Sequence, residues 1–263
     1  MGQTIFLICA GMLAGALNSV AGGGGFVAFP AMLFAGISPI QANASQTVAL
    51  WPGAAASVGA YRREYTRENR RLLWPLFVTS FIGAVAGALL LLHTPQQTFV
   101  RLIPWLLLTA TMLFALGGKI TGWIRRRIER GVRAHEGVDA APVSKLAVVG
   151  GTFVQLAFAV YIGYFGGGAG ILILSLLALM GFEKIHTMNA FKISLVLVAN
   201  GIAVATFILA KVVVWHPAMV MMMGSIVGGY LGAWYAQKLN PRHIRQFVIF
   251  VGASMTAYFF WKQ

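Results

Sequence analysis

Two clusters of glycines lie deep inside long apolar stretches, at corresponding places in the two halves of the chain. They are Gly22, Gly23, Gly24 and Gly25 in the first half, and Gly166, Gly167, Gly168 and Gly170 in the second. Glycine is less favourable than alanine in a helix interior by about 1 kcal/mol, so each cluster is expected to interrupt a helix. Within a membrane, such a break is tolerated only where the freed backbone groups face protein, water or a ligand. Interrupted segments at matching places of two halves indicate a transporter's substrate site.

A helix that begins directly after each break, near Phe26 or Ile171, would present N–H groups and the positive end of its dipole there. Such an end favours an anion, and glycine lets the backbone approach a bound oxyanion closely. The alternative is that glycines only allow close helix packing. We favour packing for the glycines spaced about four residues apart elsewhere, and the substrate site for the two clusters. The packing glycines are Gly11, Gly15, Gly83, Gly87, Gly224, Gly228, Gly229 and Gly232.

Polar residues near both clusters could complete an anion site, because amides and hydroxyls donate to an oxyanion without the tight hold of a full charge. The candidates are Asn43, Ser45, Gln46 and Asn189, with Asn18, Ser19, Thr47, Gln155, Tyr164, Ser194 and Asn200 nearby. Each of them could instead bond a neighbouring helix, which is worth about 0.6 kcal/mol on average. Asn43 and Asn189 stand out because they recur at matching places in the two halves.

Lys192 is the most suggestive single residue, since it lies five positions into an apolar span that begins near Thr187. Ionisable residues inside a membrane are functional candidates by default, and a cation would attract an anionic substrate. At a depth of about 7–8 Å, however, the Lys192 ammonium could also reach the cytoplasmic interface. The sequence leaves both interpretations open.

Other chemistries are not indicated by the sequence. The histidines show no metal-ligand spacing, and neither glycine cluster has the context of a dinucleotide or phosphate loop. No nucleophile–base pair is visible, so we expect no catalytic residue, no cofactor, no metal and no enzymatic activity. All six acidic residues fall in predicted loops, which argues against a proton or sodium relay through the membrane.

Composition predicts the elements that must position these residues. Hydrophobic residues make up 59% of the chain and charged residues 10%, against about 25% charged in globular domains. Eight long apolar runs, most of them with the roughly 20 residues of a spanning helix, predict an all-α polytopic membrane protein. The net charge of +14 gathers in a few short loops. That pattern fits membrane orientation and argues against nucleic-acid binding.

The chain divides into a first membrane repeat at 1–118, a basic cytoplasmic linker at 119–144 and a second membrane repeat at 145–263. As one straight helix, the broken segment 3–36 would be about 51 Å long, well beyond a hydrocarbon core near 30 Å. We therefore expect a glycine-broken re-entrant hairpin plus three transmembrane helices in each half. The halves also share an order: the glycine turn, an apolar stretch, Gly36 or Gly181, and then Asn43-Ala44 or Asn189-Ala190.

Charge placement favours the re-entrant arrangement. It puts sixteen lysines and arginines on one side and three on the other, whereas fully spanning segments would give fourteen against five. With three complete spans per half, the second repeat is inverted relative to the first, an architecture found in secondary transporters. The basic loops would be cytoplasmic and both termini periplasmic.

At these residues the chain resembles the sulfite exporter TauE/SafE family of bacterial inner-membrane proteins. The resemblance rests on the segments 18–25 and 41–45 with Pro30 and Gly36, and on the second cluster with Gly181 and the segment 188–192. It covers essentially the whole chain. Where the family often carries Ala-Thr-Ser, this chain has Ala44-Ser45-Gln46. The resemblance implies transport of sulfite, sulfonates and related sulfur-containing anions.

The sequence thus predicts a secondary transporter of a small sulfur-containing anion that works by alternating access, with the site at the two glycine turns. Export is the expected direction, because an inside-negative potential favours anion exit by about 2.3 kcal/mol per charge per 100 mV. The alternatives are an anion channel and a non-transporting membrane scaffold or assembly factor. The expected partners are the anionic substrate and the lipid bilayer, and a homodimer is one possible assembly.

Overall fold

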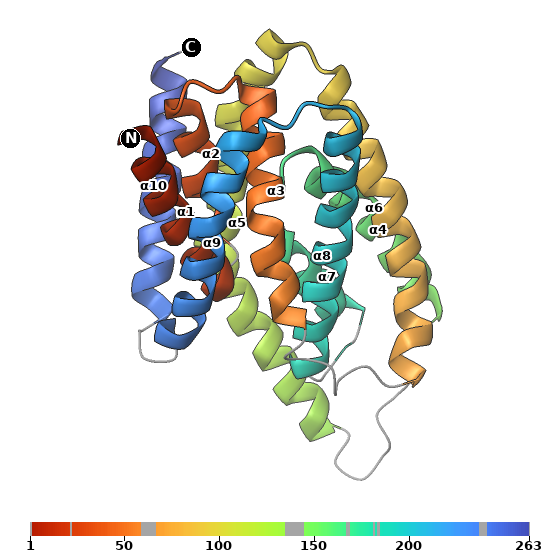
Figure 1. The fold of residues 1–263 in the computed structure, drawn as a ribbon. Helices are drawn as coiled ribbons and strands as arrows, with labels where there is room; N and C mark the ends of the chain where they lie inside the picture. The colour runs from red at the N-terminus through yellow and green to blue at the C-terminus, as the bar shows by residue number, and fades with distance from the viewer. Residues whose placement is uncertain are drawn as a thin grey trace.

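The structure of the chain is a computed structural model that describes residues 2–21, 23–58, 67–134, 145–166, 169–180, 182, 185–236 and 241–262. These residues form ten helices and no strand (Figure 1). The first half contains α1 (Gly2–Ala21), α2 (Gly25–Phe34), α3 (Pro39–Val58), α4 (Arg67–His93) and α5 (Gln96–Ala134). The second half contains α6 (Lys145–Tyr164), α7 (Ala169–Leu179), α8 (Ile185–Leu209), α9 (Trp215–Ala236) and α10 (Pro241–Trp261). The predicted all-α class is therefore confirmed.

Among the described residues, three segments are long and apolar enough to cross a membrane: Trp74–His93, Gln96–Gly117 and Ala190–Leu209. Large apolar side chains also cover the outside of the bundle, among them Phe153 and Leu209. Soluble monomers rarely expose apolar surface on this scale. A bundle with this surface fits a lipid environment.

Both glycine-rich segments are interrupted, as the sequence predicts. Helix α1 ends at Ala21 and α2 begins at Gly25, while α6 ends at Tyr164 and α7 begins at Ala169. The short second helix packs back against the longer first one in each case, α2 on α1 and α7 on α6. Each segment is therefore a helical hairpin rather than one long helix.

The most extensive helix contacts join the two halves through glycines. Gly11 and Gly15 of α1 lie against the backbone of Met221 and Ser225 of α9, while Gly228 of α9 lies against Met12. The paired residue numbers rise together, so α1 and α9 run parallel. Gly224 continues this interface, and Gly83, Gly87 and Gly163 form a similar one between α4 and α6. The packing interpretation of these glycines is confirmed, except that Gly229 makes only an ordinary contact and Gly232 lies outside the described side chains.

The chain ends and the connections between helices show in which direction each helix runs through the bundle. Both chain ends lie at the same end of the bundle as the connections 35–38, 94–95 and 210–214 (Figure 1). The opposite end carries the end of α3, the beginning of α4 and the far end of α5. Consequently, α3 and α8 run in opposite directions, as do α4 and α9.

Helix α5 continues well beyond its apolar part. Its apolar segment ends near Gly117, yet the helix extends to Ala134, into the basic segment 119–144. Arginine, isoleucine and glutamate are compatible with a helix, so the polar segment extends α5 rather than ending it. Lys119 and Arg126 are exposed on this extension.

Candidate functional site

The first glycine turn places the beginning of α2 against α3. Gly24 is the residue that precedes α2, and no side chain caps this helix end. A Cβ placed on Gly25 would lie 3.5 Å from Oε1 of Gln46, an ordinary contact distance. The beginning of α2, where the N–H groups of Phe26 and Val27 bond the carbonyls of Gly23 and Gly24, therefore lies beside the amide of Gln46.

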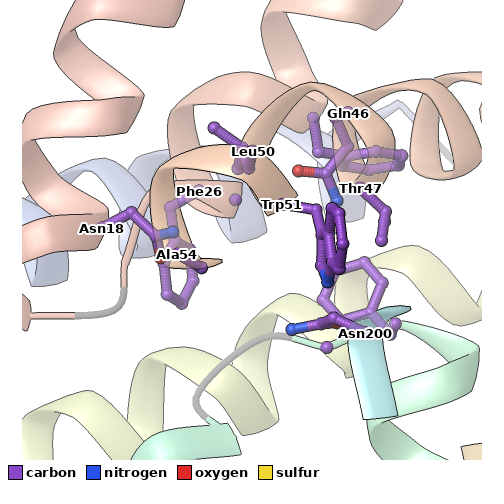
Figure 2. A pocket seen from close by; sticks show the side chains of 12 residues that line it. Asn18, Phe26, Gln46, Thr47, Leu50, Trp51, Ala54 and Asn200 are labelled. Carbon is purple, nitrogen blue, oxygen red and sulfur yellow. The ribbon is translucent and has the colours of Figure 1, made fainter. Parts of the chain in front are cut away.

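A cavity opens at this point and reaches the second glycine turn (Figure 2). Its volume is about 70 Å³. Since one water needs about 10–15 Å³, the cavity has room for several waters or for a small ligand. The lining residues come from four places: Asn18 of α1; Gly25, Phe26 and Phe29 of α2; Gln46, Thr47, Leu50, Trp51 and Ala54 of α3; and Phe165, Gly166 and Asn200 of the second half. The cavity is thus built from both halves.

Three of the predicted site residues line this cavity: Gly25, Gln46 and Gly166. Gly166 has a φ of +81°, a left-handed conformation that favours glycine, and its N–H bonds the carbonyl of Tyr161 to end α6. Asn18, Thr47 and Asn200, which the sequence singles out as polar neighbours, also line it. In Figure 2 the side chain of Asn18 lies at the left of the view, and that of Asn200 lies below Gln46 and Trp51.

Gly23 and Gly24 do not line the cavity. A Cβ on Gly23 would lie 2.9 Å from Cγ1 of Val248, and one on Gly24 would meet the carbonyl oxygen of Ala14. Both glycines allow close packing of the turn against α10 and α1. Gly22 lies outside the described residues.

Asn43 and Ser45 are buried and bonded elsewhere. The Asn43 amide donates to the carbonyl oxygen of Tyr164, the last residue of α6, at 3.0 Å. The Ser45 hydroxyl accepts from the N–H of Val214, just before α9, at 2.9 Å. Neither residue lines the cavity, and both tie α3 to the second half.

Removal of the Asn43 amide should therefore affect stability. In Asn43→Ala the carbonyl of Tyr164 loses a buried donor, which costs about 1–3 kcal/mol. We expect a lower free energy of unfolding for the purified protein in detergent. Thr109→Ala, which removes an exposed hydrogen bond to the carbonyl of Trp105 within α5, is the control and should change little. Equal stability of the two variants would contradict the role of Asn43.

The second cluster lies beside Lys192. A Cβ on Gly170 would lie 3.5 Å from Cδ of Lys192, so the aliphatic part of this half-buried lysine packs on the beginning of α7. Neither residue lines the cavity described above. Gly167 and Gly168 fall outside the described residues, as does the side chain of Asn189.

The sequence did not single out the aromatic walls. The Trp51 indole N–H donates to the carbonyl of Leu197 at 3.1 Å, and its ring lies against Gly201 of α8. The spacing of the α3 residues could have predicted this wall from the sequence. Gln46, Leu50 and Ala54 are four residues apart, as are Thr47 and Trp51, so one face of α3 carries all five.

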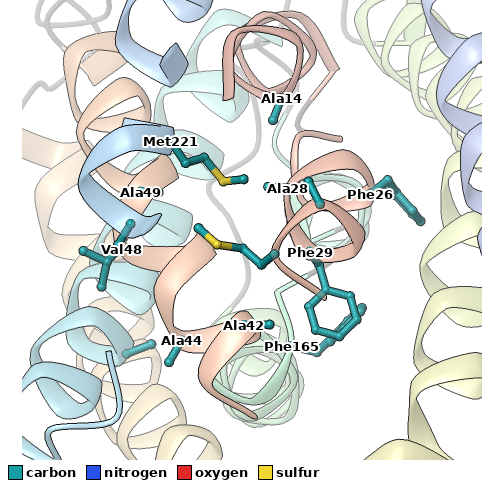
Figure 3. Packing of buried hydrophobic residues seen from close by; sticks show 14 of the residues in the cluster. Ala14, Phe26, Ala28, Phe29, Ala42, Ala44, Val48, Ala49, Phe165 and Met221 are labelled. Atoms are coloured by element: carbon teal, nitrogen blue, oxygen red, sulfur yellow. The ribbon is translucent and has the colours of Figure 1, made fainter. Parts of the chain in front are cut away.

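Apolar packing fixes α2 beside the cavity. Phe26 and Phe29 are 3% and 1% exposed, and the Phe29 ring meets that of Phe165 edge-on at 5.8 Å. Figure 3 shows Ala28 and Phe29 of α2 in the middle of this packing, with Ala14 above them, Ala49 and Met221 to the left, and Ala42 and Phe165 below. This close packing holds Phe26 and Phe29 in place at the wall of the cavity.

Comparison with known proteins places the chain in a family. A sequence profile described as "Sulfite exporter TauE/SafE" matches residues 7–259. The chain belongs to the sulfite exporter TauE/SafE family. Its relatives in this family carry names of membrane transporters. A "Probable membrane transporter protein" of Haemophilus influenzae is 28% identical over 98% of this chain and 94% of its own length.

Two further relatives show the same level of similarity. "Probable membrane transporter protein ORF9" of a Sinorhizobium species is 28% identical over 95% of this chain and 89% of its own length. "Probable membrane transporter protein YfcA" of Escherichia coli K12 is 28% identical over 94% of this chain and 85% of its own length. No solved structure matches the chain. The resemblance seen in the sequence is thus confirmed at the level of the family.

Proposed function

We propose that this TauE/SafE family protein is a secondary transporter, not an enzyme, that exports a small sulfur-containing anion such as sulfite or an organosulfonate. The observation that carries the proposal is the cavity shared by both glycine turns. Its walls contain the beginning of α2 and the amide side chains of Asn18 and Asn200. Helix starts and amides are groups that bind anions in proteins.

Alternating access requires two halves that can exchange roles, and helix packing supports such a correspondence. We match α1–α5 in order with α6–α10, so that α1 is equivalent to α6, α3 to α8 and α4 to α9. The contact of α1 with α9 then has its equivalent in the contact of α6 with α4, and the contact of α3 with α9 has its equivalent in the contact of α8 with α4. The contacts of α3 with α8 and of α5 with α10 each join two equivalent helices. Matched helices run in opposite directions, which supports an inverted repeat.

The correspondence extends to the candidate ligands. Gln46 follows Asn43 by three residues, and Lys192 follows Asn189 by three. Gly25 contacts Gln46 at the beginning of α2, while Gly170 contacts Lys192 at the beginning of α7. We propose that these are the two halves of one substrate path, with the Lys192 cation attracting the anion in the second half.

Orientation and direction follow from charge. We propose an inner-membrane location with the basic end of the bundle in the cytoplasm and both termini in the periplasm. An inside-negative potential then drives the anion outward without a coupled cation, at about 2.3 kcal/mol per charge per 100 mV. A homodimer would be compatible with this arrangement.

The proposal predicts that particular anions raise the thermal stability of the purified protein. A ligand of the folded state present at a hundred times its dissociation constant stabilises it by about 2.7 kcal/mol. We expect sulfite or small sulfonates to raise the melting temperature more than chloride, nitrate or acetate at equal ionic strength. Lys192→Met should weaken this rise. A panel in which no sulfur oxyanion differs from chloride would contradict the proposal.

A further inference from the structure

The orientation of the Gln46 amide is fixed by a chain of hydrogen bonds. The Tyr164 carbonyl only accepts, so Asn43 must direct its NH₂ group toward it, at 3.0 Å. Asn43 Oδ1 is then an acceptor, and the NH₂ group of Gln46 lies 3.4 Å from it. Turning the Gln46 amide over would place two carbonyl oxygens against each other.

This arrangement leaves Gln46 Oε1 as a buried acceptor beside the cavity. The side chain is 5% exposed, and Oε1 has no hydrogen-bond partner within the described residues. The same oxygen is the amide atom nearer to Gly25. Figure 2 shows it on the side of the amide that faces Leu50 and Phe26. A buried acceptor without a donor is unfavourable, so a water in the cavity would bond Oε1, and a ligand that displaces this water must bring a donor of its own to avoid that penalty.

The rest of the α3 face has no donor to offer either. The Thr47 hydroxyl donates to the carbonyl of Asn43 at 2.7 Å, which leaves only its lone pairs. The Trp51 indole N–H is committed to Leu197. The cavity therefore has an accepting wall on α3, while the positive end of α2 faces the same space.

We infer that the site selects small anions that carry their own N–H or O–H donor, with Gln46 as the residue that determines this specificity. The anionic group lies toward the beginning of α2, and the donor of the ligand bonds Gln46 Oε1. This inference rests on the proposed function and narrows its substrate class. Hydroxylated sulfonates, which are anions, and ammonium-bearing sulfonates, which are zwitterions with an anionic group, both have the required chemistry.

Three sulfonates of nearly equal size test this selection. Ethanesulfonate has no donor, 2-hydroxyethanesulfonate has a hydroxyl, and 2-aminoethanesulfonate has an ammonium group. From thermal stabilisation of the wild-type protein we expect at least one donor-bearing compound to bind about tenfold more tightly than ethanesulfonate. The compound that is preferred identifies the kind of donor.

Variants of two buried glutamines distinguish an effect of the cavity on ligand preference from a general effect of removing a buried glutamine. Gln46→Met removes the acceptor at similar volume and should abolish the preference. Gln155→Met is the matched control, because Gln155 Oε1 is also buried without a partner in the described structure but faces α4, with the NH₂ group of Gln155 bonded to Ser80. It should keep the wild-type preference.

The possible results distinguish a failure of the donor requirement from a failure of the proposed function. If neither the three sulfonates nor sulfite binds, the anion site itself is overturned, and if sulfite alone binds, the anion site stands and the donor-bearing sulfonate class is overturned. If all three bind the wild-type protein equally, the anion site stands and the donor requirement is overturned. Should Gln46→Met fail to fold, the preference of the wild-type protein alone decides.

Discussion

Replacing Gly228 with alanine should lower the free energy of unfolding by about 1–3 kcal/mol, and replacing it with leucine should prevent accumulation of folded protein. A Cβ at Gly228 would meet the backbone of Met12 across the parallel α1–α9 interface. No side-chain rotation relieves a clash with backbone, so the helices must separate. Helix association in a membrane depends on this close approach. Reversible unfolding in mixed detergent measures the effect.

The adjacent glycine provides the control. The atom nearest to a Cβ on Gly229 is the carbonyl oxygen of Gly15, at an ordinary 3.8 Å. Gly229→Ala should leave stability unchanged or slightly higher, since alanine is the better helix former. The packing account is wrong if the two alanine variants unfold alike.

Replacing Gly25 with leucine should abolish anion binding while the fold is kept. The first carbon of the new side chain would make an ordinary contact with Gln46 at 3.5 Å, and the remaining three would enter a cavity of about 70 Å³. The leucine would occupy the space proposed for the anion and cover the beginning of α2. We expect the anion-dependent rise in melting temperature to disappear, with little change in the melting temperature of the unliganded protein.

Gly150→Leu controls for the added leucine. Gly150 is an exposed residue of α6, and a Cβ there has no atom within 4 Å. This variant should be stabilised by anions like the wild-type protein. Stabilisation of Gly25→Leu to the same extent would show that the anion binds somewhere else.

The sequence predicted the features that depend on local chemistry. Glycine cost and segment length predicted the two helix breaks, and glycine spacing predicted the interfaces of Gly11, Gly15, Gly83 and Gly87. Gln46 and Gly25 were both candidates, and the structure brings them together. Membership of the TauE/SafE family was visible in the same residues.

The sequence could not assign roles that depend on how distant helices cross. Asn43 bonds the carbonyl of Tyr164 at the end of α6, 121 residues further along the chain, and Ser45 bonds a residue 169 positions away. Gly23 and Gly24 pack against α10 and α1 because of where the turn sits in the bundle. The role of Trp51 depends likewise on the crossing of α3 with Gly201 of α8.

The most direct test of the central claim is counterflow in proteoliposomes. Vesicles containing the purified protein and preloaded with unlabelled sulfite should transiently accumulate radiolabelled sulfite from outside, because a carrier exchanges its substrate across the membrane. Gly150→Leu should retain this exchange and Gly25→Leu should lose it. Equal exchange by Gly25→Leu, or its absence from wild-type vesicles for every sulfur oxyanion tested, would contradict the proposed transport through the cavity between the glycine turns.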